Sequence, residues 1–157
     1  MDFGKLQADI VKNLYKYIDN PAAQDYKIYG DISVDNNKYI PVVYKNWVVY
    51  LIPIEKWLIK DDSQRDPNRL LPLLTDIYTA SKMFDTGVYK EHCKTQLRQL
   101  VTDKSLNIWV NSKLLKPFGN DITFYNSTFE EDVIYIKDTG DNLLGLVLMV
   151  NLAPEAI

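Results

Sequence analysis

Cysteine and histidine are almost absent from this sequence, which contains one of each, Cys93 and His92. A single cysteine excludes a disulfide within the chain, in agreement with a reducing compartment. A zinc site needs about four ligands, so this adjacent pair predicts no metal site. We interpret Cys93 as a half-buried position on a helix.

Glycine and long apolar runs are also scarce. The six glycines are not grouped, which excludes a glycine-rich phosphate-binding loop. The longest apolar runs, residues 47–54 and 143–150, are far shorter than the roughly 20 residues of a membrane-spanning helix. The N-terminal residues lack the basic segment and apolar run of a signal peptide. These features predict a cytoplasmic protein that does not enter a membrane.

Residue combinations typical of catalysis are missing too. The histidine has no nucleophile-elbow serine near it in the sequence. Carboxylates cluster at Asp61-Asp62 and at Glu130-Glu131-Asp132. Both clusters lie in predicted loops, where we expect solvated charge, with a hydrated magnesium or calcium ion as the alternative. We therefore predict no catalytic residue, no cofactor and no enzymatic activity.

The residues that are present are typical of one soluble globular domain. The chain has 157 residues, of which 46% are hydrophobic and 25% charged, and this length fits a single core. The net charge of -3 is unevenly distributed, because residues 119–157 hold one lysine against seven acidic residues. Such asymmetry can orient a protein against a polyanion, although solubility is its more common cause.

Hydrophobic periodicity predicts an α+β fold. Apolar residues at spacings of three and four predict a helix over 3–18, ended by Asn20-Pro21. A spacing of two then predicts three antiparallel strands, over 25–34, 39–44 and 47–52. Residues 3–53 therefore form a first unit of one helix and three strands.

Residues 54–105 interrupt that strand pattern. Residues 60–68 are polar and rich in turn formers, as expected of a surface loop. Beyond the loop, apolar residues at helical spacing predict two helices, over 70–78 and 89–101. We therefore predict a helical insertion.

Residues 106–152 repeat the plan of the first unit. A short helix is expected at 111–116, capped by Asn111 or Ser112. With the tail at 153–157, the whole chain, 1–157, is predicted to be a single domain. The strands of this second unit are predicted at 106–110, 121–125, 133–137 and 143–152.

The second unit carries a recognisable order of apolar segments. Leu114 and Leu115 lie in the middle of its short helix, and apolar strand segments follow at 122–125, 133–136 and 146–152. This order resembles the closing section of bacterial and phage DNA sliding clamps. In that family a leucine-containing helix precedes a strand, a polar loop, a strand with a V-x-I-like core, a turn and a last apolar strand. The resemblance lies mainly in residues 111–152.

The resemblance implies a clamp-like domain in a non-catalytic, DNA-associated protein of phage or prophage origin. Lysines on the helices would contact the phosphates of double-stranded DNA without reading its sequence. A clamp subunit normally contains two or three such domains, so a ring of this chain would be a homo-oligomer of about six copies. The implied DNA-binding residues are Lys5, Lys12, Lys16, Lys113 and Lys116.

Two further hypotheses stay open. The chain could instead be a phage protein-interaction module that binds a host replication or defence protein through the insertion and an exposed sheet edge, without contacting DNA. Separately, Tyr15-Lys16-Tyr17 and Tyr26-Lys27-Ile28-Tyr29 interleave aromatic and basic residues. That pattern is found where single-stranded nucleic acid stacks on a protein, and tyrosines also fill ordinary sheet faces.

Overall fold

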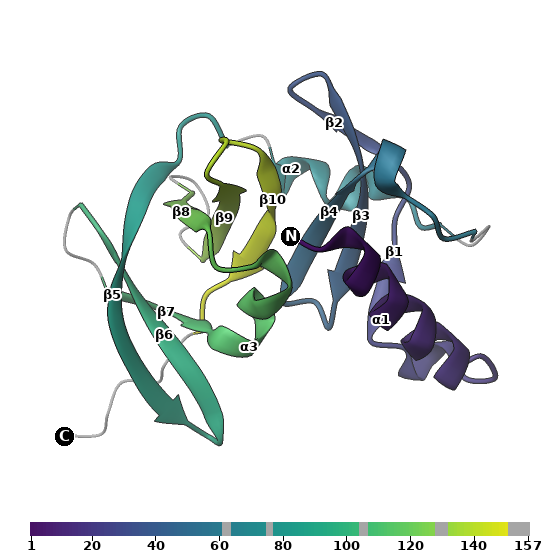
Figure 1. The fold of residues 1–157 in the computed structure, drawn as a ribbon, viewed down its shortest axis with the longest axis horizontal. Helices are drawn as coiled ribbons and strands as arrows, with labels where there is room; N and C mark the ends of the chain where they lie inside the picture. Colours follow the sequence, from purple (N-terminus) through teal and green to yellow (C-terminus); the bar gives the residue numbers. More distant parts are fainter. Residues whose placement is uncertain (61–63, 75–76, 104–106, 128–131, 151–157) are drawn as a thin grey trace.

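The computed structural model describes residues 1–60, 64–74, 77–103, 107–127 and 132–150. In these parts of the chain, ten strands form one sheet with the order β1-β3-β4-β10-β9-β8-β5-β6-β7, and β2 lies beside β3 (Figure 1). All neighbouring strands are antiparallel. The predicted α+β class is confirmed.

The helices are α1 (Phe3–Lys16), α2 (Leu71–Leu74) and α3 (Ser112–Leu115), with short 3-10 turns between some elements. The strands are β1 (Tyr26–Ile28), β2 (Ile32–Val34), β3 (Asn37–Tyr44), β4 (Val48–Pro53), β5 (Ser81–His92), β6 (Thr95–Thr102), β7 (Asn107–Asn111), β8 (Ile122–Asn126), β9 (Val133–Asp138) and β10 (Leu143–Leu148).

Helix α1 begins at a side-chain cap, and one buried glutamine bonds it to the segment that follows β4. The Asp2 carboxylate accepts a hydrogen bond from the Lys5 backbone N–H at 3.0 Å, which satisfies a free donor of the first turn. The Gln7 amide donates to the Lys56 carbonyl at 2.9 Å and accepts from the Leu58 N–H at 2.8 Å. The helix ends at Lys16, two residues before its predicted end.

The strand predicted over 25–34 is divided into β1 and β2, which both pair with β3. Arg65 lies beside the chain at this division, where its N–H donates to the Ile28 carbonyl at 2.9 Å and its carbonyl accepts from the Gly30 N–H at 2.8 Å. Pro41 lies in β3 between the residues that pair with β1 and those that pair with β2. A residue without an N–H interrupts the sheet least at such a break.

The prediction of a helical insertion is wrong for most of its length. The predicted helix over 89–101 is instead part of the β5–β6 hairpin, whose turn residues Cys93 and Lys94 have φ angles of 50° and 63°. Leu97 and Leu100, three residues apart on one strand, face opposite sides of the sheet. Both are buried, so two apolar residues three positions apart, the spacing typical of one side of a helix, lie here on a strand. Cys93 is exposed at the turn rather than half-buried on a helix.

The other predicted helix of the insertion is shorter than expected. Of the range 70–78, only Leu71–Leu74 is helical, and residues 75–76 lie outside the described residues. In the second unit, the strand, the short helix and the three strands after it form as predicted, except that β10 ends at Leu148 and the end of its predicted range lies outside the described residues. Asn111 is the cap of α3, since its side chain accepts from the Lys113 N–H at 3.0 Å.

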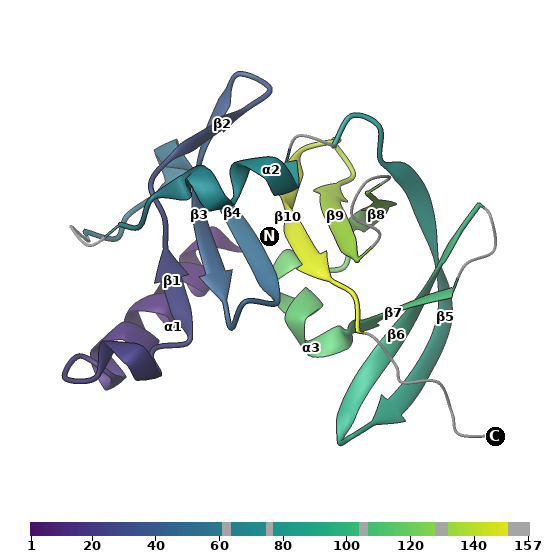
Figure 2. The same ribbon diagram turned by 180° about the vertical axis from the view of Figure 1, so that it is seen from behind.

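The sheet has a separate apolar core on each face. On one face, Leu6 and Ile10 of α1 and Leu115 of α3 pack in the same cluster of buried side chains. On the other face, Leu70 and Leu74 around α2 pack on the sheet, which is the side seen in Figure 2. Helices α1 and α3 therefore cover the same face of the sheet, and α2 covers the opposite one.

The N-terminal and C-terminal strands join where β4 pairs with β10. Gly145 lies opposite Tyr50 in this pairing. A Cβ atom at Gly145 would lie 2.1 Å from the Val49 carbonyl oxygen and 2.9 Å from the Phe118 ring, so only glycine fits. The close approach lets the turn after α3 pack directly on the centre of the sheet.

Candidate nucleic-acid interface

The predicted DNA-binding lysines of α1 lie on one side of the helix. Lys5, Lys12 and Lys16 are all exposed, and the opposite side buries Leu6 and Ile10. The Lys16 ammonium group lies 5.4 Å from the centre of the Tyr17 ring, a distance typical of a cation–π contact. The three ammonium groups therefore face solvent along the length of α1.

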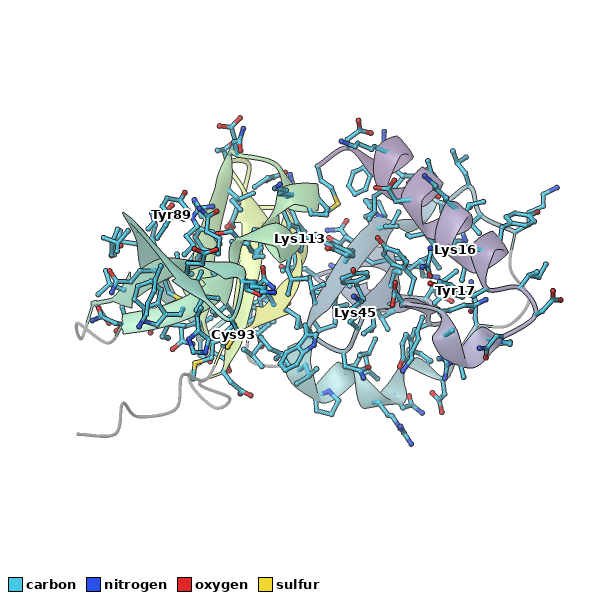
Figure 3. All side chains as sticks on the ribbon, turned by 90° about the horizontal axis from the view of Figure 1, so that it is seen from below. Lys16, Tyr17, Lys45, Tyr89, Cys93 and Lys113 are labelled. Atoms are coloured by element: carbon cyan, nitrogen blue, oxygen red, sulfur yellow. The ribbon has the colours of Figure 1, made fainter. Side chains whose placement is uncertain are left out.

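The two remaining predicted lysines follow Asn111, the cap of α3. Lys113 lies in α3 and Lys116 in the 3-10 turn that continues it, and both are exposed. Figure 3 labels Lys113 near the middle of the molecule and Lys16 on α1. Since α1 and α3 cover the same face of the sheet, the structure brings all five lysines to the two helices of that face.

The charge of this helix face is only partly offset. Asp2 and Asp9 are exposed on or beside α1, and the Asp2 carboxylate is already used as the helix cap. Among the described residues, the ion pairs are Arg98–Asp85 and Lys137–Asp141, and neither involves the five lysines. Their ammonium groups are therefore available to phosphate oxygens.

Sequence reasoning missed a groove beside α1. A cavity of about 830 Å³ lies between the helix and residues 58–60. Tyr15, Ile18 and Leu58 line it and are 70%, 62% and 78% exposed. We name this surface the α1 groove. A signal was present in the sequence, because Ala8, Val11, Tyr15 and Ile18 continue a second apolar stripe at spacings of three and four.

A second cavity, of about 660 Å³, also escaped the sequence analysis. It lies between the β3–β4 turn, α3 and the tip of the β5–β6 hairpin, and Tyr26, Tyr44, Trp47 and Tyr50 line it together with Lys113. We name it the aromatic pocket. Its residues come from five segments far apart in the sequence, so no local pattern indicated it.

The carboxylate clusters noted in the sequence lie largely where the structure gives no description. Asp61, Asp62, Glu130 and Glu131 fall outside the described residues, and Asp132 lies inside them. Within the described ranges, no three His, Cys, Asp or Glu side chains gather in a way that could hold a metal ion. Among the helices of the same ranges, none has the length and apolar composition needed to cross a membrane.

Comparison with known proteins adds no further constraint, since no protein-family model, curated protein or solved structure matches this chain.

Proposed function

We propose that this chain is a non-catalytic, sliding-clamp-like protein that associates with the backbone of double-stranded DNA through α1 and α3. The observation that carries the proposal is the placement of both helices on one face of the sheet, with five exposed lysines and no ion pair among them in the described part of the chain. Ammonium groups spread along helices contact phosphates without reading bases.

The strand order supports a clamp-like arrangement. Starting from the β4–β10 pairing, the sheet runs outward through β3 to β1 on one side and through β9 to β8 on the other. Each side thus begins with three strands in line, preceded in the chain by a helix on the same face, and β2 pairs with β3 as a further strand of the first side. This order is the one expected if two helix-plus-three-strand units are joined at their last strands.

The β5–β6 hairpin is an addition to the two helix-plus-three-strand units. It pairs with β8 on one side and with β7 on the other, and so lengthens the sheet beyond the second unit. In this proposal the protein encircles DNA as a homo-oligomer of about six copies. Retention on the duplex is topological, and the lysines supply a weak attraction that permits sliding.

A titration of a fluorescent duplex at several salt concentrations tests the proposal. Five phosphate contacts predict a slope of about -4.5 for the logarithm of affinity against the logarithm of salt concentration. Changing Lys12 or Lys113 to Glu is expected to weaken binding and to reduce the slope by about 1. Arg69→Glu is the matched control, because Arg69 is exposed beside α2 on the opposite face. Equal losses in all three variants would contradict the assignment of the helix face.

A second candidate function, a module that binds a protein and not DNA, is favoured by the α1 groove. Its walls are α1 and the first residues of the segment predicted as an insertion. Exposed apolar surface that forms a continuous groove is typical of helix or peptide binding. Under this candidate the chain has no affinity for duplex DNA, and Ile18→Ser or Leu58→Ser abolishes capture of a partner protein. Lys12→Glu reduces duplex affinity only under the first proposal.

A further inference from the structure

The aromatic pocket has the size and the composition of a small-ligand site. Its volume of about 660 Å³ falls within the range of about 300–1,000 Å³ that ligand pockets occupy. Figure 3, seen from below, labels three of its lining residues, Lys113, Lys45 and Cys93, around the middle of the molecule. Of the five lysines proposed to contact duplex DNA, this pocket shares Lys113 alone.

Aromatic rings held at defined angles form much of its lining. The Tyr26 and Tyr44 rings lie 4.9 Å apart between centroids, with a 49° tilt. The Tyr50 ring is buried against Phe118 at 5.0 Å, and its hydroxyl group donates to the Leu114 carbonyl at 3.3 Å. Trp47 is 52% exposed at the rim. Rings fixed in this way present flat π surfaces to a planar ligand at little entropic cost.

The charge of the pocket is positive. Lys45 from the β3–β4 turn and Lys113 from α3 line it, and none of the described lining residues is an aspartate or a glutamate. The Lys45 ammonium group lies 5.3 Å from the centre of the Tyr44 ring, so charge and aromatic surface adjoin. Burial raises the pKa of Tyr26 to about 12 and also raises that of Tyr50. Both phenols therefore remain neutral at neutral pH and do not offset the lysines.

We propose that the aromatic pocket binds a nucleotide, with the base stacked on the tyrosine rings and the phosphate paired with Lys45 and Lys113. A quaternary ammonium ligand, which also favours aromatic walls, is repelled by the two lysines. Aromatic rings beside ammonium groups are the combination that holds single nucleotides and single strands without sequence preference. The nucleotide is either free in solution or part of a single strand.

Calorimetric titration of the full chain with four probes tests this proposal. The probes are adenosine 5′-monophosphate, adenosine, inorganic phosphate and a single-stranded oligodeoxyadenylate. The monophosphate or the oligonucleotide is expected to bind more tightly than adenosine or phosphate alone, because base and phosphate are both recognised. Binding of the monophosphate identifies a free nucleotide as the ligand, and binding of the oligonucleotide alone identifies a nucleotide within a strand.

Two variants of the pocket have matched controls elsewhere. Tyr44→Ala is expected to weaken binding about five- to hundredfold, the usual effect of removing one stacking ring. Tyr78→Ala is expected to leave it unchanged, because Tyr78 is exposed and does not line the pocket. Lys45→Asn removes the charge with a residue that tolerates the φ of 50° at this turn. Its control is Arg69→Asn, because Arg69 is an exposed cation on the opposite face of the sheet. Tyr44→Phe keeps the ring and is expected to keep the affinity, which separates stacking from a loss of fold.

Three results would overturn the nucleotide proposal. The first is no binding of either the monophosphate or the oligonucleotide, and the second is equal affinity for the monophosphate and inorganic phosphate. The third is an equal effect of Tyr44→Ala and Tyr78→Ala. Failure of the duplex proposal gives a different pattern, since duplex affinity would then be insensitive to Lys12 while the pocket variants still changed the affinity for the monophosphate.

Discussion

Substituting Gly145 by alanine places a methyl group where the β4–β10 pairing leaves no space for it. The added carbon would lie 2.1 Å from the Val49 carbonyl oxygen and 2.9 Å from the Phe118 ring. The first contact is with backbone, which moves only if the pairing of the two strands is distorted. Overpacking of this kind costs about 1–3 kcal/mol. For a chain of this length each kcal/mol lowers the melting temperature by about 2–4 °C, so a decrease of about 2–12 °C is expected.

Thermal unfolding followed by circular dichroism measures this decrease, and Gly4→Ala is its control. At Gly4, within α1, the nearest atom to an added Cβ is the Asp2 carboxylate oxygen at 3.5 Å, an ordinary contact. Alanine in a helix is favoured over glycine by about 0.5–1 kcal/mol, so this variant is expected to melt at a higher temperature. Equal melting temperatures for Gly145→Ala and the unsubstituted chain would refute the close packing of β10 on β4.

Two further predictions concern α1 and the aromatic pocket. Gln7→Ala removes the amide group that donates to the Lys56 carbonyl and accepts from the Leu58 N–H. This change is expected to lower the free energy of unfolding by about 1–3 kcal/mol in a urea titration. No change would show that water replaces these two hydrogen bonds freely. Since burial raises the pKa of Tyr26 from 10.0 to about 12, the unfolded chain loses this proton first, and stability is expected to fall as the pH rises through that range. Tyr26→Phe is expected to show a weaker fall, and an identical pH profile would contradict the burial of the phenol.

The parts of the fold that local patterns specify were predicted well. Helix α1 has a continuous apolar side and a capping aspartate, and the β9–β10 hairpin has two apolar strands around a Thr-Gly-Asp-Asn turn. Each of these features is formed by residues that lie close together in the sequence. Their energetics depend mainly on neighbours in sequence, so a single sequence is sufficient to find them.

The β5–β6 hairpin could not be predicted in the same way. Strand β6 has β5 on one side and β7 on the other, and it buries Leu97 on one face and Leu100 on the opposite face. A strand covered on both faces loses the alternation of apolar and polar residues by which strands are recognised. The hairpin turn at Cys93-Lys94 lacks the glycine that usually marks such a turn, so the second signal was missing as well.

The candidate sites also differ in whether local sequence patterns specify them. The lysines of α1 follow from helical periodicity, and the structure leaves all of them exposed. The aromatic pocket depends on Tyr44 and Lys113 lining the same cavity, although they lie 69 positions apart in the sequence. Only the β4–β10 pairing and the packing of α3 on that face bring such residues together, and both are tertiary interactions.

The most direct measurement of duplex association is the molar mass in solution by light scattering, with and without duplex DNA at low and at high salt. We predict a mass increase with the duplex at low salt that high salt reverses and that Lys12→Glu diminishes. The same mass with and without the duplex at low salt would contradict the proposed role of the helix face.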